Sequence, residues 1–410
     1  MANETAMLIT VGTGIGTSQD VRDSLAHGIL YAINHYNPKR IVFFGSDESL
    51  KTVESLKRQY MEKHNRELDF SEFIEISEVD NFKKYFTAIK SKIDDLEDEY
   101  NIIVDYTSGT KTMTMSAAFA SMLYHKKLIF VSGEREGGLV LKGTEEIKSQ
   151  NLYLVYDELM TTKIKELFNS NRFEAGKVLI DDIVGSKSEK EAFTKLFNSY
   201  SSFDNVNYVN VLENFDLNLF VSVWPDLEKD FQKNMKALNI LNVKNHGQKC
   251  YYVLASLLNN ARRRSEEHKY DDAIARLYRC LELIAQIKLK EYDIKTSDVD
   301  LNILKEKGIK EDYINEFRSN SEGKIKIGLT QDYILLNELN DNLGNFYIEN
   351  EKVIQNLLKY RNQSILAHGL DSQDEDQYCE FRQLVLKAAN VLNPNIDNFI
   401  GETIFPEFEI

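Results

Sequence analysis

Cysteine is scarce in this 410-residue chain: there are three, Cys250, Cys280 and Cys379. They lie far apart and form no CxxC pair, which excludes a disulfide framework and disfavours a cysteine-rich zinc site. The seven histidines show no HxxxH, HExxH or HxH spacing, so the sequence gives no indication of a metal centre. Unpaired cysteines are typical of a protein from a reducing cytosol.

Long hydrophobic runs are also missing. No apolar stretch approaches the roughly 20 residues that a membrane-spanning helix needs. Residues 1–5 contain no basic side chain, and the apolar run after them is too short for a signal peptide. We therefore expect a soluble, cytoplasmic protein.

Positive charge is in deficit, because 50 Lys and Arg stand against 65 Asp and Glu, a formal net charge of −15. Proteins that coat nucleic acid are usually basic, so this balance disfavours such a role and leaves RNA binding in a local cationic cleft. The 42% share of hydrophobic residues is enough for ordinary globular cores. A chain of this length is expected to form two or three domains.

Over about the first 155 residues, short β-rich runs alternate with helical patterns. Residues 41–44 are apolar throughout, as expected for a strand buried on both faces of a parallel sheet. The alternation predicts a doubly wound, Rossmann-like α/β domain. Segments 139–142 and 152–156 are predicted to form an antiparallel extension at its edge. The other predicted strands are 7–11, 40–44, 73–76, 102–105 and 128–132, and the predicted helices are 18–36, 50–67, 82–98 and 112–125.

From about residue 157 to near residue 392 helical periodicity dominates, with only 324–329 showing β-like alternation. The sequence therefore predicts an all-α C-terminal half. We divide the chain into an α/β domain over 1–156, a helical connecting region over 157–250 and a helical domain over 251–410. The predicted helices are 158–168, 173–184, 188–200, 226–242, 248–264, 271–290, 350–360 and 374–391.

A first candidate binding loop follows the first predicted strand. Open α/β sheets bind ligands at the carboxyl ends of their strands, where glycines let backbone amides approach a phosphate. The spacing is GxGxG rather than GxGxxG, which disfavours a nicotinamide dinucleotide. A tight turn without a ligand is the alternative interpretation. The candidate residues are Gly12, Thr13, Gly14, Gly16, Thr17 and Ser18.

A second candidate loop leaves the strand 102–105 and enters a helix rich in small residues. Hydroxyls, a glycine and a lysine at a helix N-terminus suit an anionic ligand. The loop is not a P-loop, because Thr110 separates Gly109 from Lys111. An N-capping segment with an exposed lysine is the alternative, although a cap needs only one hydroxyl. The candidate residues are Thr107, Ser108, Gly109, Thr110 and Lys111.

Near the C-terminus, Arg361 and His368 are seven positions apart. If this segment is helical, two turns place both side chains on one face. A fixed cation beside a side chain that exchanges protons near neutral pH suits phosphodiester chemistry. A structural histidine before a helix-ending Gly369 is the alternative. No GxSxG or cysteine–histidine arrangement indicates a protein nucleophile.

Arginines are unusually concentrated in the predicted helices 248–264 and 271–290. For each arginine alone, an ion pair within its own helix is the simpler interpretation. As a group they are candidates for binding RNA phosphates. They are Arg262, Arg263, Arg264, Arg276 and Arg279.

Together these segments resemble CRISPR-associated proteins of the CARF–HEPN type, found with type III CRISPR systems. Residues 105–113 look like the family's Asp-x-Thr-Gly-Gly-Thr-Lys-x-Met signature, with Ser108 replacing a glycine. Residues 270–286 resemble the characteristic helix of its C-terminal domain. Residues 361–368 fit the HEPN motif, in which four to six residues separate an arginine from a histidine. The resemblance covers most of the chain.

The resemblance implies that the CARF domain binds a cyclic oligoadenylate at a homodimer axis and that two HEPN domains form a composite endoribonuclease. In such enzymes the 2′-hydroxyl of single-stranded RNA attacks the adjacent phosphate and leaves a 2′,3′-cyclic phosphate, without a metal or other cofactor. By this analogy His368 handles protons, Arg361 stabilises the pentacoordinate phosphate and Asn362 positions one of them.

Two other functions remain open. The protein is alternatively a non-catalytic cyclic-oligoadenylate sensor that signals to a partner, or its CARF domain degrades its own activator. A nucleotide-dependent oxidoreductase is the least favoured, given the glycine spacing. The ring size of the activator and the RNA sequence preference do not follow from the sequence.

Overall fold

The computed structural model describes residues 4–14, 18–136, 139–244, 246–311, 313–315, 325–367 and 369–410. It divides into two compact units. The first comprises residues up to Met160 together with Asp182–Ser186, and the second comprises Thr161–Asp181 and Lys187–Ile410. The separate connecting region over 157–250 stays a prediction.

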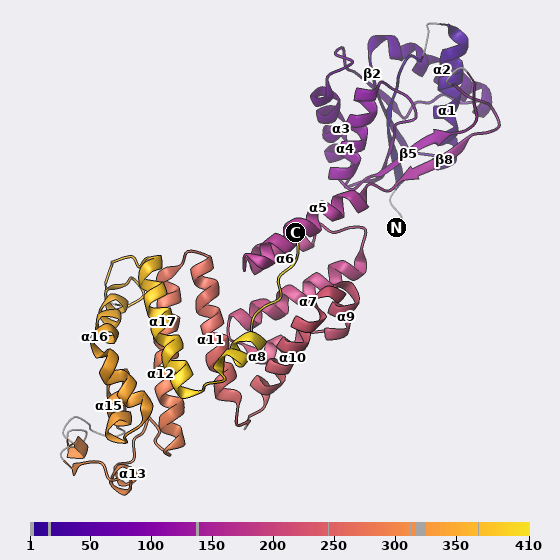
Figure 1. Cartoon of the computed structure of the whole chain (residues 1–410). Helices are drawn as coiled ribbons and strands as arrows, with labels where there is room; N and C mark the ends of the chain where they lie inside the picture. The colour runs from indigo at the N-terminus through magenta and orange to yellow at the C-terminus, as the bar shows by residue number, and fades with distance from the viewer. Residues whose placement is uncertain are drawn as a thin grey trace. The chain divides into compact units, whose positions relative to one another are not determined.

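The first unit is built on a six-stranded sheet in the order β3-β2-β1-β4-β5-β8 (Figure 1). The first five strands pair in parallel, and β8 pairs antiparallel with β5. A separate two-stranded ladder joins β6 to β7. The strands are β1 (Glu4–Thr10), β2 (Arg40–Gly45), β3 (Ser71–Glu75), β4 (Tyr100–Asp105), β5 (Lys127–Ser132), β6 (Arg135–Glu136), β7 (Leu139–Val140) and β8 (Glu146–Gln150).

Helices cover both faces of this sheet, with α1 and α2 on one side and α3 and α4 on the other (Figure 1). Successive strand residues point to opposite faces, so Met7 and Ile9 join one core while Ala6 and Leu8 join the other. Burial on both faces explains the continuous apolar runs, and the α/β prediction is confirmed. The helices are α1 (Gln19–Tyr36), α2 (Asp47–His64), α3 (Phe82–Leu96) and α4 (Lys111–Leu123).

The edge of the sheet differs from the prediction. The antiparallel strand is Glu146–Gln150, whereas residues 153–156 begin the helix α5 (Tyr153–Asn169). Within β8 only Ile147 is partly buried, because the strand lies at the edge of the sheet and pairs only with β5. A strand without an apolar face gives no two-residue periodicity, so it cannot be recognised from hydrophobic pattern.

In the described part of the second unit, all regular elements other than an isolated β-bridge are helices, which confirms the all-α prediction. Segment 324–329 is not a strand, because residues 325–328 are irregular and Leu329 begins α15. The elements are α6 (Phe173–Ile180), α7 (Lys187–Asp204), α8 (Tyr208–Asn214), α9 (Leu217–Val223), the 3-10 helix η1 (Pro225–Leu227), α10 (Glu228–Asn242), α11 (Lys249–Glu266), α12 (Tyr270–Glu291), α13 (Leu301–Glu306), α15 (Leu329–Glu338), α16 (Asn342–Gln363), α17 (Glu375–Leu392) and α18 (Ile396–Glu402).

Helix α12 lies among α11, α15, α16 and α17 and contacts all four (Figure 1). Its apolar stripe, which includes Leu277 and Leu281, is buried as its periodicity predicts. Across the described residues, no helix combines the length and apolar character needed to cross a membrane.

Candidate functional site

The two candidate loops of the first unit meet at one point of the sheet. Strands β1 and β4 are neighbours, but β1 leads into α1 on one face and β4 into α4 on the other. Their carboxyl ends therefore lie at the switch point where open α/β sheets bind ligands. Ser108 joins the loops, because its Oγ accepts the Gly12 N–H at 3.0 Å and its carbonyl oxygen accepts the Thr10 hydroxyl at 2.6 Å.

The loops approach so closely that their contact requires glycine. A Cβ on Gly12 would lie 2.9 Å from the Cα of Gly109. Gly109 also has a φ of +132°, which L side chains rarely adopt. These two glycines are therefore needed for the backbone arrangement, independently of any ligand.

Most of the hydroxyls in the second loop already have protein partners. Thr107 Oγ1 donates to the Asp105 carboxylate at 2.5 Å and accepts the Val131 N–H at 2.8 Å. Thr110 is the N-cap of α4. The capping interpretation thus holds for Thr110, and Lys111 is exposed in the first turn of α4, as that interpretation also expects. Lys111 and the backbone N–H groups at this helix terminus remain suited to an anion.

Asp105 anchors the second loop from the interior. It is completely buried, and this burial raises the pKa of its carboxyl to about 6. Its Oδ2 has no hydrogen-bond partner among the described residues. In the first loop, Thr13 and Gly14 are described, and Ser18 caps α1 by accepting the Val21 N–H at 3.4 Å. Gly16 and Thr17 lie outside the described residues.

The segment carrying the predicted catalytic residues is not one helix. Helix α16 ends at Gln363, and Ser364 is its extended C-cap. The condition for aligning Arg361 and His368, a helix that continues through this segment, is therefore not met. Arg361 and Asn362 lie in the last turn of α16. His368 lies outside the described residues.

The chain after α16 forms a turn organised by Ser364, which sequence reasoning missed. The N–H groups of Ala367 and Gly369 both donate to the Ser364 carbonyl oxygen, at 3.0 and 3.2 Å. The Asp371 N–H donates to the Gln363 carbonyl oxygen at 3.0 Å. A Cβ on Gly369 would lie 1.9 Å from that same oxygen, so the turn requires glycine there.

Arg361 is held by two neighbours. Its guanidinium carbon lies 4.5 Å from the centroid of the Tyr278 ring on α12, a cation–π distance. Its Nη1 donates to Asn362 Oδ1 at 3.0 Å. Two predicted catalytic residues are thus in contact. Tyr278 was missed, because nothing in its helical spacing indicates a partner so far along the chain.

A pocket of about 610 Å³ adjoins this contact. Tyr278 and Asn362 line it together with the start of α15 and one side of α16. Burial, with a contribution from Glu282, raises the pKa of Tyr278 to about 12, so its hydroxyl stays neutral. The remaining lining residues are Gly328, Leu329, Thr330, Gln331, Gln355, Leu358, Lys359 and Gln363.

Asp332 follows these lining residues on α15 and is 1% exposed. Neither carboxyl oxygen has a hydrogen-bond partner among the described residues. Burial, followed by the charge of Glu282, raises its pKa to about 8. Asp332 is therefore mostly protonated at neutral pH and adds little negative charge near Arg361.

Two of the arginines proposed for RNA binding form ion pairs inside the protein that stabilise the fold. Arg263 is 3% exposed, forms an ion pair with Asp204 at 2.8 Å and stacks on Phe405, with 3.8 Å between the guanidinium carbon and the ring centroid. Arg264 pairs with Asp204 at 2.6 Å and with Glu267 at 2.9 Å. These contacts leave neither guanidinium available to RNA, and we omit both from the proposed site.

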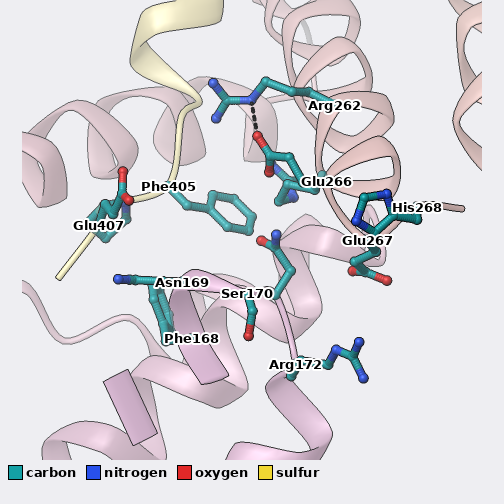
Figure 2. A pocket seen from close by; sticks show the side chains of 13 residues that line it. Phe168, Asn169, Ser170, Arg172, Arg262, Glu266, Glu267, His268, Phe405 and Glu407 are labelled. Atoms are coloured by element: carbon teal, nitrogen blue, oxygen red, sulfur yellow. Dashed lines mark ion pairs between the residues drawn. The ribbon is translucent and has the colours of Figure 1, made fainter. Parts of the chain in front are cut away.

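The other three arginines pair within their own helices, as the simpler interpretation predicts. Arg262 pairs with Glu266 at 3.3 Å on the wall of a pocket of about 400 Å³ (Figure 2). Figure 2 shows Phe405 in the same pocket. Within α12, the ion pairs are Arg276–Asp272 at 2.8 Å and Arg279–Glu282 at 3.2 Å. Across the described residues, no three His, Cys, Asp or Glu side chains group to hold a metal ion.

Residues 242–392 match the family model described as the Csm6 HEPN domain. The whole fold is similar to Enterococcus italicus Csm6 bound to cyclic hexa-2′-fluoro-hexa-dAMP, with a TM-score of 0.66, 15% identity and coverage of 98% of this chain and 100% of that chain. The chain has the Csm6 fold. The predicted architecture, an α/β N-terminal domain followed by an all-α half, is thereby confirmed, and the match to the Csm6 HEPN domain model lies in the second unit.

Can2 from Sulfobacillus thermosulfidooxidans in complex with cyclic tetra-adenylate matches over 50% of this chain and 68% of that chain, at 12% identity. Its TM-score of 0.25 is too low to indicate a common arrangement. No curated protein matches the sequence.

The Arg361–Tyr278 contact predicts a measurable coupling. In a double-mutant cycle by urea unfolding, we expect Arg361→Ala and Tyr278→Leu to be non-additive by about 0.5–1 kcal/mol, the cation–π contribution at a partly exposed site. Tyr278→Phe keeps the ring and should retain most of the coupling. Additive effects of the two substitutions would show that the contact contributes nothing.

Asp332 predicts a stability that depends on pH. The folded chain keeps its proton up to about pH 8, whereas an unperturbed carboxyl loses it near 3.8. Folded protein thus binds more protons between these values, so rising pH destabilises it. Asp332→Asn removes this pH-dependent loss of stability. The difference in Tm, variant minus wild type, should therefore be larger at pH 8.5 than at pH 4.5, by on the order of 5 °C. A difference that does not change with pH would contradict the buried-acid assignment.

Proposed function

We propose that the protein is an endoribonuclease of type III CRISPR antiviral defence that a cyclic oligoadenylate switches on. The observation that supports this most is the held pair Arg361–Asn362 beside a pocket in a Csm6 HEPN domain. The E. italicus Csm6 of the same fold is described as bound to a cyclic hexanucleotide, which favours a ligand of this class for the first unit.

In the proposed reaction, the RNA's own 2′-hydroxyl attacks the adjacent phosphorus, and the bond to the 5′-oxygen of the next nucleotide breaks. The products carry a 2′,3′-cyclic phosphate and a 5′-hydroxyl. His368 handles protons, while Arg361 stabilises the extra negative charge on the pentacoordinate phosphate. Since Tyr278 and Asn362 already hold Arg361, the guanidinium loses less freedom when the charge develops. No metal or other cofactor enters this proposal.

The proposed enzyme acts as a homodimer. Three aliphatic side chains in and beside the turn after α16 are exposed: Ile365 by 66%, Leu366 by 52% and Leu370 by 89%. Such apolar exposure beside a site favours a surface that another protein covers. A two-fold axis there would bring two turns together and form one composite site.

We assign the activator to the loops joined by Ser108. Its phosphates would meet Lys111, the N-terminus of α4 and the closely packed backbone at Gly12 and Gly109. The substrate is single-stranded RNA, because in-line attack by the 2′-hydroxyl needs a backbone that a duplex does not restrain. Arg262, Arg276 and Arg279 each form an ion pair within their own helix, and Arg276 also donates to Asn260 Oδ1 on α11. All three remain candidates for contacts with RNA.

The direct test is cleavage of unstructured RNA by the full chain, with cyclic tetra-adenylate, with cyclic hexa-adenylate and with neither. We expect one ring size to stimulate cleavage, EDTA to have no effect, and products to end in a 2′,3′-cyclic phosphate. Arg361→Ala and His368→Ala should each lower the rate by about 10²-fold or more, because each removes transition-state stabilisation.

His246→Ala is the matched control, since His246 is an exposed histidine that only caps a local N–H. Undiminished cleavage by His368→Ala would refute the catalytic assignment. No cleavage by the unaltered chain with either activator, combined with tight binding of one, would instead favour a non-catalytic sensor.

A further inference from the structure

The pocket beside Arg361 has the chemistry of a base-binding site rather than a phosphate-binding site. Amide side chains predominate among its polar groups, and Tyr278 supplies an aromatic surface. Among the described residues that line it, Lys359 is the one with a cationic side chain. Phosphate sites gather cations, whereas RNA bases bind to aromatic rings and to amide donors and acceptors. The volume of about 610 Å³ is in the range of small-molecule sites.

The orientation of the Gln331 side-chain amide is fixed, so its NH2 group is a hydrogen-bond donor toward the pocket. It is the third residue of α15, and its Oε1 accepts the backbone N–H of Gly328 at 3.3 Å. A backbone N–H can only donate, so the amide oxygen must face it. The amide nitrogen of Gln331, which has no other hydrogen-bond partner among the described residues, is left as a donor for the pocket.

Gln355 presents the complementary group from α16. Its Nε2 donates to the Tyr347 hydroxyl at 2.9 Å, which leaves its Oε1 as an acceptor. One fixed donor and one acceptor therefore line the same pocket. The Watson–Crick edge of a nucleobase carries an acceptor and a donor side by side. Gln331 and Gln355 can therefore form complementary hydrogen bonds with such an edge.

Asn362 connects this pocket with the proposed cleavage site. It lines the pocket and also accepts the hydrogen bond from Arg361. A phosphate at Arg361 and a base in the pocket would then belong to neighbouring parts of one RNA strand. We propose that this pocket selects the nucleobase next to the cleaved phosphate, with Gln331 and Gln355 as its specificity-determining residues. The inference rests on the proposed ribonuclease function.

Gln331→Glu tests this with little change to the fold. Glutamate keeps an oxygen for the Gly328 N–H, as in a capping box, but replaces the donor in the pocket with an acceptor. The full chain with its activator is given RNAs that differ only in the base next to the cleavage site. We expect the ratios of kcat/KM between these RNAs to change by about tenfold. Gln355→Leu should reduce the preference without inverting it.

Gln377→Glu is the matched control. Gln377 Oε1 accepts the Asp374 N–H at 3.0 Å at the start of α17, but its side chain does not line the pocket. This variant should keep the wild-type ratios and a thermal stability similar to that of Gln331→Glu. Unchanged ratios in both Gln331→Glu and Gln355→Leu, with a wild type that cleaves, would overturn the inference.

A wild type that cleaves no RNA would contradict the proposed function instead. In that case, a measurement of RNA binding tests the base-reading role of the pocket independently of cleavage. Competition between short oligo(A), oligo(C), oligo(G) and oligo(U) gives relative affinities for the wild type and the variants. Gln331→Glu must change these relative affinities, and equal values for both proteins would overturn the base-reading role.

Discussion

Helix α12 constrains the second unit, because it is packed against α11, α15, α16 and α17 at once. Its buried stripe fixes the rotation of the helix about its own axis, and this rotation brings the Tyr278 ring to the surface beneath Arg361. The position of the guanidinium thus follows from core packing several residues away. The same packing brings the start of α15 and the side of α16 around one pocket.

The first unit uses its polar groups in a different way. Thr107, Ser108 and Thr110 direct their hydroxyls to the loops themselves, and the close contact of Gly12 with Gly109 sets the backbone path. In the proposed function, recognition of the activator is left to backbone N–H groups and Lys111. The described contacts between Gly12, Ser108 and Gly109 are thus formed without a ligand, so the proposed anion would lose little free energy in ordering them.

Hydrophobic pattern was sufficient for the elements that are buried on a regular face. Strands β1, β2 and β4 were predicted from their continuous apolar runs, and the stripe of α12 was predicted from its helical periodicity. The observed strand order, in which β1 and β4 are neighbours, brings the two loops together. The pattern failed for β8, which buries little, and it gave no sign of the turn that follows α16 at Gln363. There the turn is fixed by the Ser364 carbonyl and by the close packing of Gly369, which are contacts rather than residue preferences. The burial of Arg263 could not be predicted from the sequence pattern either, because its partners Asp204 and Phe405 come from distant segments of the chain.

The central claim is that a ligand in the first unit controls RNA cleavage in the second. It is tested most directly by measuring the cleavage rate of the full chain against activator concentration, for the wild type and for Lys111→Ala. Loss of a charge-assisted contact should raise the half-maximal activator concentration by about tenfold or more, and the maximal rate should stay the same. A cleavage rate that does not depend on cyclic oligoadenylate, or a Lys111→Ala variant with a lower maximal rate at unchanged half-maximal concentration, would contradict the account.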